Sequence, residues 1–340
     1  MPTTDATPPR DRSGRIKGMG ILQIVLGSLC GLMALILVLT AALQRSMPSA
    51  LGGGQPSPIA SLAFSMIMYG ALAASLIWVG VGALRLRRWV PKVVLAINWP
   101  FLLIGAVATV GAIWFMPVVM RISIASAAAG APAGQVPAMS AAISEGVATI
   151  TTVVTVVVLF LLYVLIPGLH VLLFRGRDVQ ETCDARDPTP RWTDDLPVSV
   201  VGLVVWLGAS TLTWLGMGLI GYGVLFGWVL TGVPALLLGA LYAVVSGVLA
   251  WFVARRRPAA WWATVAFFAV ILGASLSTFF VTDLGEIYRR SGLLPERQIA
   301  AMEPVMGSLT VAMRVLGAVC GAALLAFMVV IKKHFGARAA

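Results

Sequence analysis

Long apolar stretches alternate with short polar segments along this chain, and each apolar stretch can form a membrane-spanning helix. Crossing the ~30 Å hydrocarbon core of a bilayer takes about 20 apolar residues. Residues 197–254 form one uncharged run, which we divide at the Gly221–Gly232 stretch because so long a helix cannot fit one bilayer. The pattern thus predicts eight spans, at residues 18–43, 61–84, 93–118, 147–174, 198–221, 229–254, 259–281 and 305–331.

Composition agrees with this pattern. Hydrophobic residues make up 59% of the chain and charged residues 11%, with a mean hydropathy of +0.96. Soluble domains carry about 25% charged residues, so the sequence predicts an all-α, polytopic membrane helix bundle.

The net charge is +11, and the distribution of the Lys and Arg residues along the chain predicts a membrane topology. We therefore expect no nucleic-acid partner. With both termini in the cytoplasm, the inner segments hold most of the Lys and Arg residues. These are Arg10, Arg12, Arg15, Lys17, Arg85, Arg87, Arg88, Lys92, Arg175, Arg177, Arg186, Arg191, Arg255, Arg256, Arg257, Lys332, Lys333 and Arg338. The outer segments hold Arg45, Arg121, Arg289, Arg290 and Arg297.

Short matches between the two halves predict an internal duplication. At one offset, Gly70-Ala71-Leu72 matches Gly239-Ala240-Leu241, and Arg87-Arg88 matches Arg256-Arg257. We expect two parallel four-span units, residues 18–174 and 198–333, because an even number of spans keeps both units in the same orientation. The remaining parts are a disordered N-terminal segment at 1–17, a connector at 175–197 and a tail at 334–340.

The connector, residues 175–197, is the most polar segment between the predicted spans. Six of the thirteen acidic residues lie in it, namely Asp178, Glu181, Asp184, Asp187, Asp194 and Asp195. Asp178 and Glu181 have the spacing of a capping box, which predicts a short helix with Val179 and Cys183 on one face. Pro188 and Pro190 predict an extended stretch. Trp192 is predicted to anchor the segment at the membrane interface. We expect Thr193, Asp194 and Asp195 to cap the next helix.

Two features on the opposite side of the predicted bundle are candidates for function. Arg314 is the only charged residue well inside a predicted span. It either reaches outward to Glu303 or Glu145 or contacts an anion, a lipid or a substrate. Asp283 and Glu286 predict the start of a short amphipathic helix on the outer surface, which is either a surface loop or a binding lid.

Catalytic, cofactor and metal sites are not predicted. Gly216–Gly221 has GxGxxG spacing but lies at the end of an apolar span, without the strand that a dinucleotide site requires. His170 and His334 have no ligand-type neighbour at metal-binding spacing. GxxxG spacings at Gly27–Gly31, Gly223–Gly227 and Gly317–Gly321 favour close helix packing.

The connector contains Thr182-Cys183, Asp187-Pro188 and Trp192-Thr193-Asp194, in the pattern T-C-x-x-x-D-P-x-x-x-W-T-D. In this pattern the chain resembles a family of bacterial multi-pass inner-membrane proteins with no known activity. The resemblance implies a location in the bacterial cytoplasmic membrane and implies no reaction.

We therefore expect a non-enzymatic scaffold, accessory or sensing subunit that acts through the connector, with membrane lipids and a protein as its partners. The candidate partner-binding residues are Thr182, Cys183, Asp187, Pro188, Trp192, Thr193 and Asp194. The alternative is a transporter or lipid-handling protein with a pathway between the two repeats, for which Arg314 and Glu303 are the candidate intramembrane contacts.

Overall fold

The computed structural model describes residues 11–46, 58–129, 138–292 and 296–336. Eight helices in these ranges are long and apolar enough to cross a membrane, which confirms the predicted number of spans and a multi-pass membrane protein. Seven of them are α1 (Ser13–Ser46), α2 (Pro58–Leu84), α3 (Val90–Ala129), α7 (Val198–Ile220), α8 (Val233–Ala254), α9 (Pro258–Val281) and α11 (Glu296–Ile331). The eighth is α4 (Ala138–Phe160), which continues through a π-helical turn (Leu161–Leu165) into α5 (Ile166–Phe174).

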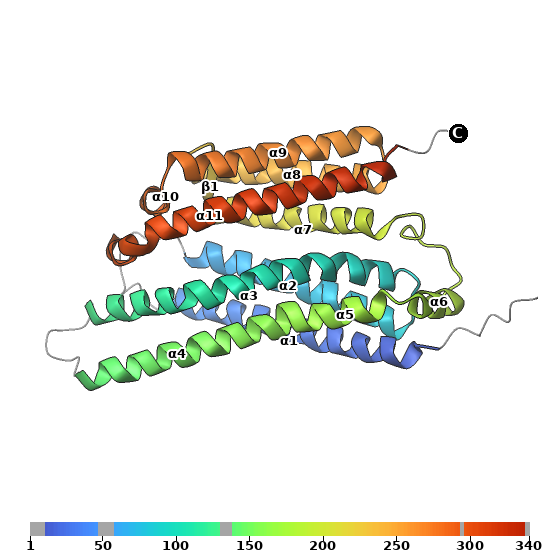
Figure 1. The fold of residues 1–340 in the computed structure, drawn as a ribbon, viewed down its shortest axis with the longest axis horizontal. Coiled ribbons are helices and arrows are strands. Elements are labelled where there is room, and N and C mark those ends of the chain that lie inside the picture. Colours follow the sequence, from blue (N-terminus) through green and yellow to red (C-terminus); the bar gives the residue numbers. More distant parts are fainter. Residues whose placement is uncertain (1–10, 47–57, 130–137, 293–295, 337–340) are drawn as a thin grey trace, which may run out of the picture.

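Helices that follow each other in sequence pack in pairs (Figure 1). In the first half α1 packs along α2, and α3 along α4 and α5; in the second half α7 packs along α8, and α9 along α11. The halves meet where α7 contacts α2 and α3 and where α11 contacts α3. The pairing order is the same in both halves.

Glycines allow the closest helix pairs to form. A Cβ on Gly27 of α1 would lie 2.8 Å from Ile77 of α2, and a Cβ on Gly239 of α8 would lie 2.7 Å from the Cα of Gly218 in α7. A side chain at either position would push the helices apart, so these glycines set the spacing. Gly321 also packs directly against Leu272. The prediction that Gly223–Gly227 is a helix-packing motif is wrong, because both glycines lie outside the helices.

Those two glycines belong to a β-hairpin between α7 and α8 that the sequence reading missed. Strand β1 (Tyr222–Leu225) pairs antiparallel with β2 (Trp228–Thr231), and both turn residues, Phe226 and Gly227, have positive φ. Such turns suit the twist of a two-residue hairpin. The predicted spans 198–221 and 229–254 were therefore slightly too long at this junction, since α7 ends at Ile220 and α8 begins at Val233.

The short helix α10 (Leu284–Ser291) lies at the same end of the bundle as β1 (Figure 1). Its predicted capping is confirmed, because Asp283 accepts a hydrogen bond of 2.8 Å from the Glu286 amide. Glu286 also forms an ion pair of 2.7 Å with Arg290, one turn along the helix. Ile287 is buried beneath them, as expected for an amphipathic surface helix.

At the opposite end, the α2–α3 and α8–α9 turns share one backbone geometry. Leu86 and Arg256 have φ of 51° and 54°, and each amide bonds to the carbonyl three residues earlier. The amide of the next residue, Arg87 or Arg257, donates to the carbonyl five residues earlier in the chain. The two hydrogen bonds together form a Schellman motif at the end of each helix. These are the two turns that the sequence matches had paired, but the equivalent positions are Leu86 with Arg256 and Arg87 with Arg257, one residue out of register with the predicted match. Both turns adjoin the connector.

Candidate functional site

The connector lies at the end of the bundle that also holds the start of α1 and the end of α11 (Figure 1). It contacts three basic segments from both halves. Arg12 pairs with Asp178 at 3.1 Å, Lys92 donates to the carbonyl of Thr193 at 2.9 Å, and Arg256 donates to the carbonyl of Asp195 at 3.3 Å. Arg256 also donates to His334 beyond α11. The connector therefore contacts the segment before α1 and both Schellman turns, and Arg256 links it to the residues after α11.

The first part of the connector is helix α6 (Arg177–Arg186). The predicted capping box is wrong, because Gly176 occupies the cap position without a side-chain bond. Asp178 pairs instead with Arg12, and Glu181 pairs with Arg177 at 2.8 Å. The predicted helix face is confirmed, since Val179 and Cys183 are both buried in the core at this end of the bundle.

Asp187, directly after α6, is the most enclosed acidic group of the connector, with a side chain that is 4% exposed. Its carboxylate accepts bonds of 3.4 Å from the Arg87 guanidinium and the Arg88 amide, and Arg191 lies 3.6 Å away. Burial alone would raise the pKa of Asp187. The Arg88 amide and the charges of Arg191 and Arg87 outweigh it and hold this pKa below its ordinary value.

Arg88 links the two acidic parts of the connector. Its Nε lies 3.2 Å from Asp184 and 3.1 Å from Asp194, although its hydrogen is aligned with neither oxygen, so both contacts are ion pairs without a hydrogen bond. Because Asp184 belongs to α6 and Asp194 to the turn before α7, Arg88 holds these two segments together.

Lys92, in the first turn of α3, organises the end of the connector. Its ammonium donates to the carbonyls of Thr193, Asp194 and Leu196 at 2.9, 2.7 and 3.4 Å. An ammonium has three donors, and here each has an acceptor. These bonds fix the turn that leads into α7.

The predicted cap of α7 is wrong. The helix begins at Val198, with Pro197 as its cap residue and no side-chain bond to its first amides. The Asp194 carboxylate instead accepts a hydrogen bond of 2.8 Å from the Arg191 amide, within the turn that precedes the helix. Thr193 is fully buried, and Asp195 contributes only its carbonyl, to Arg256.

The predicted partner-binding residues thus divide into two groups. Thr182 bonds to the Asp178 carbonyl and the Arg12 amide and is half-buried. Cys183, Asp187 and Thr193 are buried, and Asp194 is engaged by Arg88, so these residues hold the connector to its own chain. Only Pro188 and Trp192 are exposed. Sequence reasoning missed Arg87, Arg88 and Lys92 as members of the site, although a basic turn facing an acidic segment is a signal of pairing.

We expect Cys183 to resist alkylation in the folded protein. Its side chain is 0% exposed, and burial, together with Asp184 and Asp187, raises the pKa of the thiol to about 12. Since the thiolate is the reactive form, maleimide at mildly alkaline pH should modify Cys183 only after unfolding. Peptide mass spectrometry, which separates the labelled positions from Cys30 and Cys320, gives the rate at each site, and Thr189→Cys adds an exposed thiol as the positive control. Equal labelling rates at 183 and 189 would contradict the burial.

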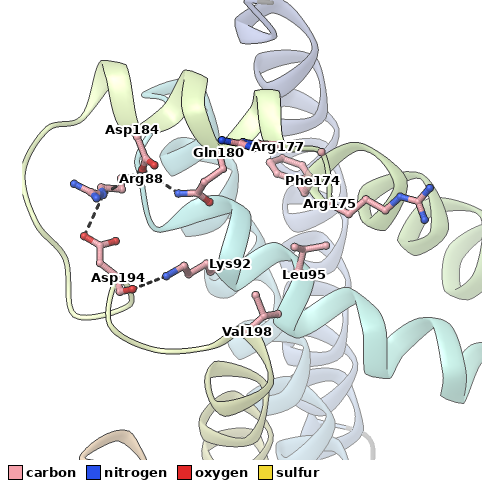
Figure 2. Close-up of a pocket in the computed structure, with 11 residues that line it drawn as sticks. Arg88, Lys92, Leu95, Phe174, Arg175, Arg177, Gln180, Asp184, Asp194 and Val198 are labelled. Atoms are coloured by element: carbon pink, nitrogen blue, oxygen red, sulfur yellow. Dashed lines mark hydrogen bonds and ion pairs between the residues drawn. The ribbon is translucent and has the colours of Figure 1, made fainter. Parts of the chain in front are cut away.

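A cavity of about 340 Å³ opens beneath the connector (Figure 2). Arg88, Lys92, Asp184 and Asp194 form its polar side, and Leu95, Phe174 and Val198 lie along the other side (Figure 2). The lining also includes Arg175, Gly176, Arg177 and Gln180.

Arg314 and Glu303 have different partners. Arg314 donates to the carbonyl of Phe279 at 2.6 Å and lies over the ring of Phe280. Phe279 is in the last turn of α9, whose carbonyls lack partners within the helix, so Arg314 caps that end. Glu303 is 70% exposed, with Arg289 at 3.9 Å. Within the described residues, no group of three or more His, Cys, Asp or Glu side chains could hold a metal ion.

Comparison with known proteins adds no relative: no family model, curated protein or solved structure matches the chain. The resemblance in the connector pattern therefore stays a prediction. What the structure does show is an integral, multi-pass membrane protein with eight candidate spans.

Proposed function

We propose that the protein is a non-enzymatic scaffold, accessory or sensing subunit of the bacterial cytoplasmic membrane, built from two four-helix repeats. Its partner binds an exposed strip of the connector, formed by Ala185, Arg186, Pro188, Thr189, Pro190 and Trp192. The observation that carries the proposal is the division of the connector into an inner side bonded to its own chain and this outer strip.

The outer strip has the composition of a protein-binding surface. Trp192 is 56% exposed, and tryptophan is a frequent energetic centre of protein interfaces. Pro188 and Pro190 restrict the backbone before binding, so less conformational entropy is lost when a partner associates. Asp187 and Arg88 fix the segment from its inner side. The strip is therefore a presented surface and not a loose loop.

Two observations support the repeat and the topology within this proposal. The α2–α3 and α8–α9 turns have the same Schellman geometry, and helices pair in the same order in both halves. The start of α1, the connector and the end of α11 lie at one end, where the basic residues predicted to be cytoplasmic are concentrated.

Site-specific photo-crosslinking in cells tests the proposal. A photoreactive residue at Thr189, in the strip, should give a crosslink to a discrete second polypeptide. The same residue at Thr193, which is buried four positions away, should give crosslinks only within the chain. Loss of the Thr189 product on Trp192→Ala would link the partner to the strip, whereas identical products from both positions would remove its support.

The alternative, lipid handling, is favoured by a second cavity of about 240 Å³ at the opposite end, although this cavity lies within the second half and not between the two repeats. Its lining is mostly apolar and includes Gly218, Tyr222, Tyr242 and Phe279, with Leu284 and Ile287 contributed by α10. A discriminating experiment follows, because Arg314 caps the helix end beside this cavity. If Arg314→Ala abolished function while Asp187 and Trp192 variants kept both function and abundance, the lipid-handling alternative would replace the scaffold.

A further inference from the structure

We propose that the cavity beneath the connector binds a phosphate group, and that the headgroup of an anionic phospholipid is the source that its shape fits. This site does not depend on a protein partner. Its evidence is the charge, the two-sided lining and the position of the cavity.

The cavity carries an excess of positive charge. Four basic residues, Arg88, Lys92, Arg175 and Arg177, line it against two acidic ones, Asp184 and Asp194, which gives a net charge of +2. The two carboxylates both lie against Arg88 and leave this group with a net charge of −1, so the excess of positive charge comes from Lys92, Arg175 and Arg177. Lys92 bonds to neutral carbonyls, so its full unit of charge remains to attract an anion.

Two further groups favour an anion at the mouth. Arg175 is exposed, and Arg177 pairs with Glu181 on the solvent side, where its side chain is 91% exposed. An ion pair so exposed contributes little and leaves Arg177 free to contact a ligand. The α6 helix begins beside the cavity at Gly176 without a side-chain cap, and the positive end of its dipole favours an anion there.

The other side of the lining is apolar and lies at the membrane surface. Phe174 ends one candidate span, Val198 begins the next, and Leu95 lies within the first turns of a third. Headgroups occupy this depth on either face of a bilayer. A phosphate at the mouth beside Arg177 would let the glycerol and the start of an acyl chain lie along these three side chains. In Figure 2 the Arg175 side chain points away from them, so Arg175 contributes positive charge at the rim.

The test is the ligand-induced rise in unfolding temperature of the purified full-length protein in neutral detergent. The probes are short-chain phosphatidylglycerol, short-chain phosphatidylcholine and glycerol 1-phosphate. Phosphatidylglycerol should stabilise the protein more than phosphatidylcholine does, because the choline cation balances the charge of the phosphate in the second lipid. Arg175→Gln/Arg177→Gln should require roughly tenfold more phosphatidylglycerol for the same shift, because it removes two of the positive charges that line the cavity.

The matched control is Arg85→Gln/Arg186→Gln, which removes the same charge from exposed residues outside the cavity and should respond as the unmodified protein does. Glycerol 1-phosphate is the probe for a soluble ligand. If it also stabilises the protein, and only the Arg175→Gln/Arg177→Gln variant fails to respond, the cavity binds phosphate from a soluble compound. Equal responses of the two double variants, or equal effects of the two lipids, would overturn the proposal.

Discussion

Replacing Lys92 by methionine is expected to destabilise the protein by about 1.5–3 kcal/mol, the range for hydrogen bonds to a charged group. Methionine keeps the unbranched side chain and removes the ammonium that bonds to three carbonyls of the connector. Those carbonyls would lose a partner at the point where the chain enters α7. Thermal or SDS-induced unfolding in detergent measures the change.

The control for this substitution is Lys17→Met, which removes the same charge from an exposed position in α1 and should change stability by less than about 0.5 kcal/mol. Lys92→Met should also expose the connector to proteases, because its end is no longer fixed. An unfolding transition of Lys92→Met that coincides with that of Lys17→Met would show that the three bonds contribute nothing to the fold.

Replacing Asp187 by alanine is expected to cost about 2 kcal/mol at neutral pH. The substitution leaves Arg87, Arg191 and the Arg88 amide without their shared acceptor. Breaking a fully buried ion pair costs about 3–5 kcal/mol, and the value is lower here because both arginines are about one-third exposed. Asp195→Ala, which removes an exposed carboxylate from the same connector, should be close to neutral.

The pH dependence gives this prediction a second measurement. The pKa of Asp187 is lower in the folded protein than its ordinary value of 3.8, so the folded state favours the ionised form. Its contribution is fully present above pH 3.8 and is lost as the pH falls through the folded pKa. Asp187→Ala should therefore show a smaller loss of stability below pH 3.8 than the unmodified protein. Parallel pH profiles would contradict the assigned environment.

The parts of the fold that follow from local rules could be predicted from the sequence. Apolar length gave the spans, helical spacing gave the buried pair Val179 and Cys183, and the capping box at Asp283 formed as expected. Glu286 of α10 has its nearest basic neighbours, Arg289 and Arg290, in the same helix turn. There, local spacing alone determines the pairing.

The connector could not be predicted in the same way, because its side chains pair over long sequence distances. Asp178 has the spacing of a cap, but Arg12, at the start of the chain, provides a cation for it. Thr193 and Asp194 precede a helix, but Lys92 and Arg88 hold them in a turn. Local capping contributes about 1 kcal/mol, and a partly buried charged contact can exceed it. The β-hairpin was missed because its residues are as apolar as the spans beside it.

The end of the bundle that carries the connector must face the cytoplasm for the connector to meet a cytoplasmic partner. Single-cysteine variants Thr189→Cys in the connector and Glu296→Cys at the start of α11 test this directly, in a background where Cys30, Cys183 and Cys320 are replaced by alanine. The Glu296 side chain is 75% exposed, and Thr189 lies in the outer strip. With a membrane-impermeant maleimide, we expect position 296 to be labelled in intact cells and position 189 only in inverted membrane vesicles. Labelling of position 189 in intact cells would contradict a cytoplasmic connector.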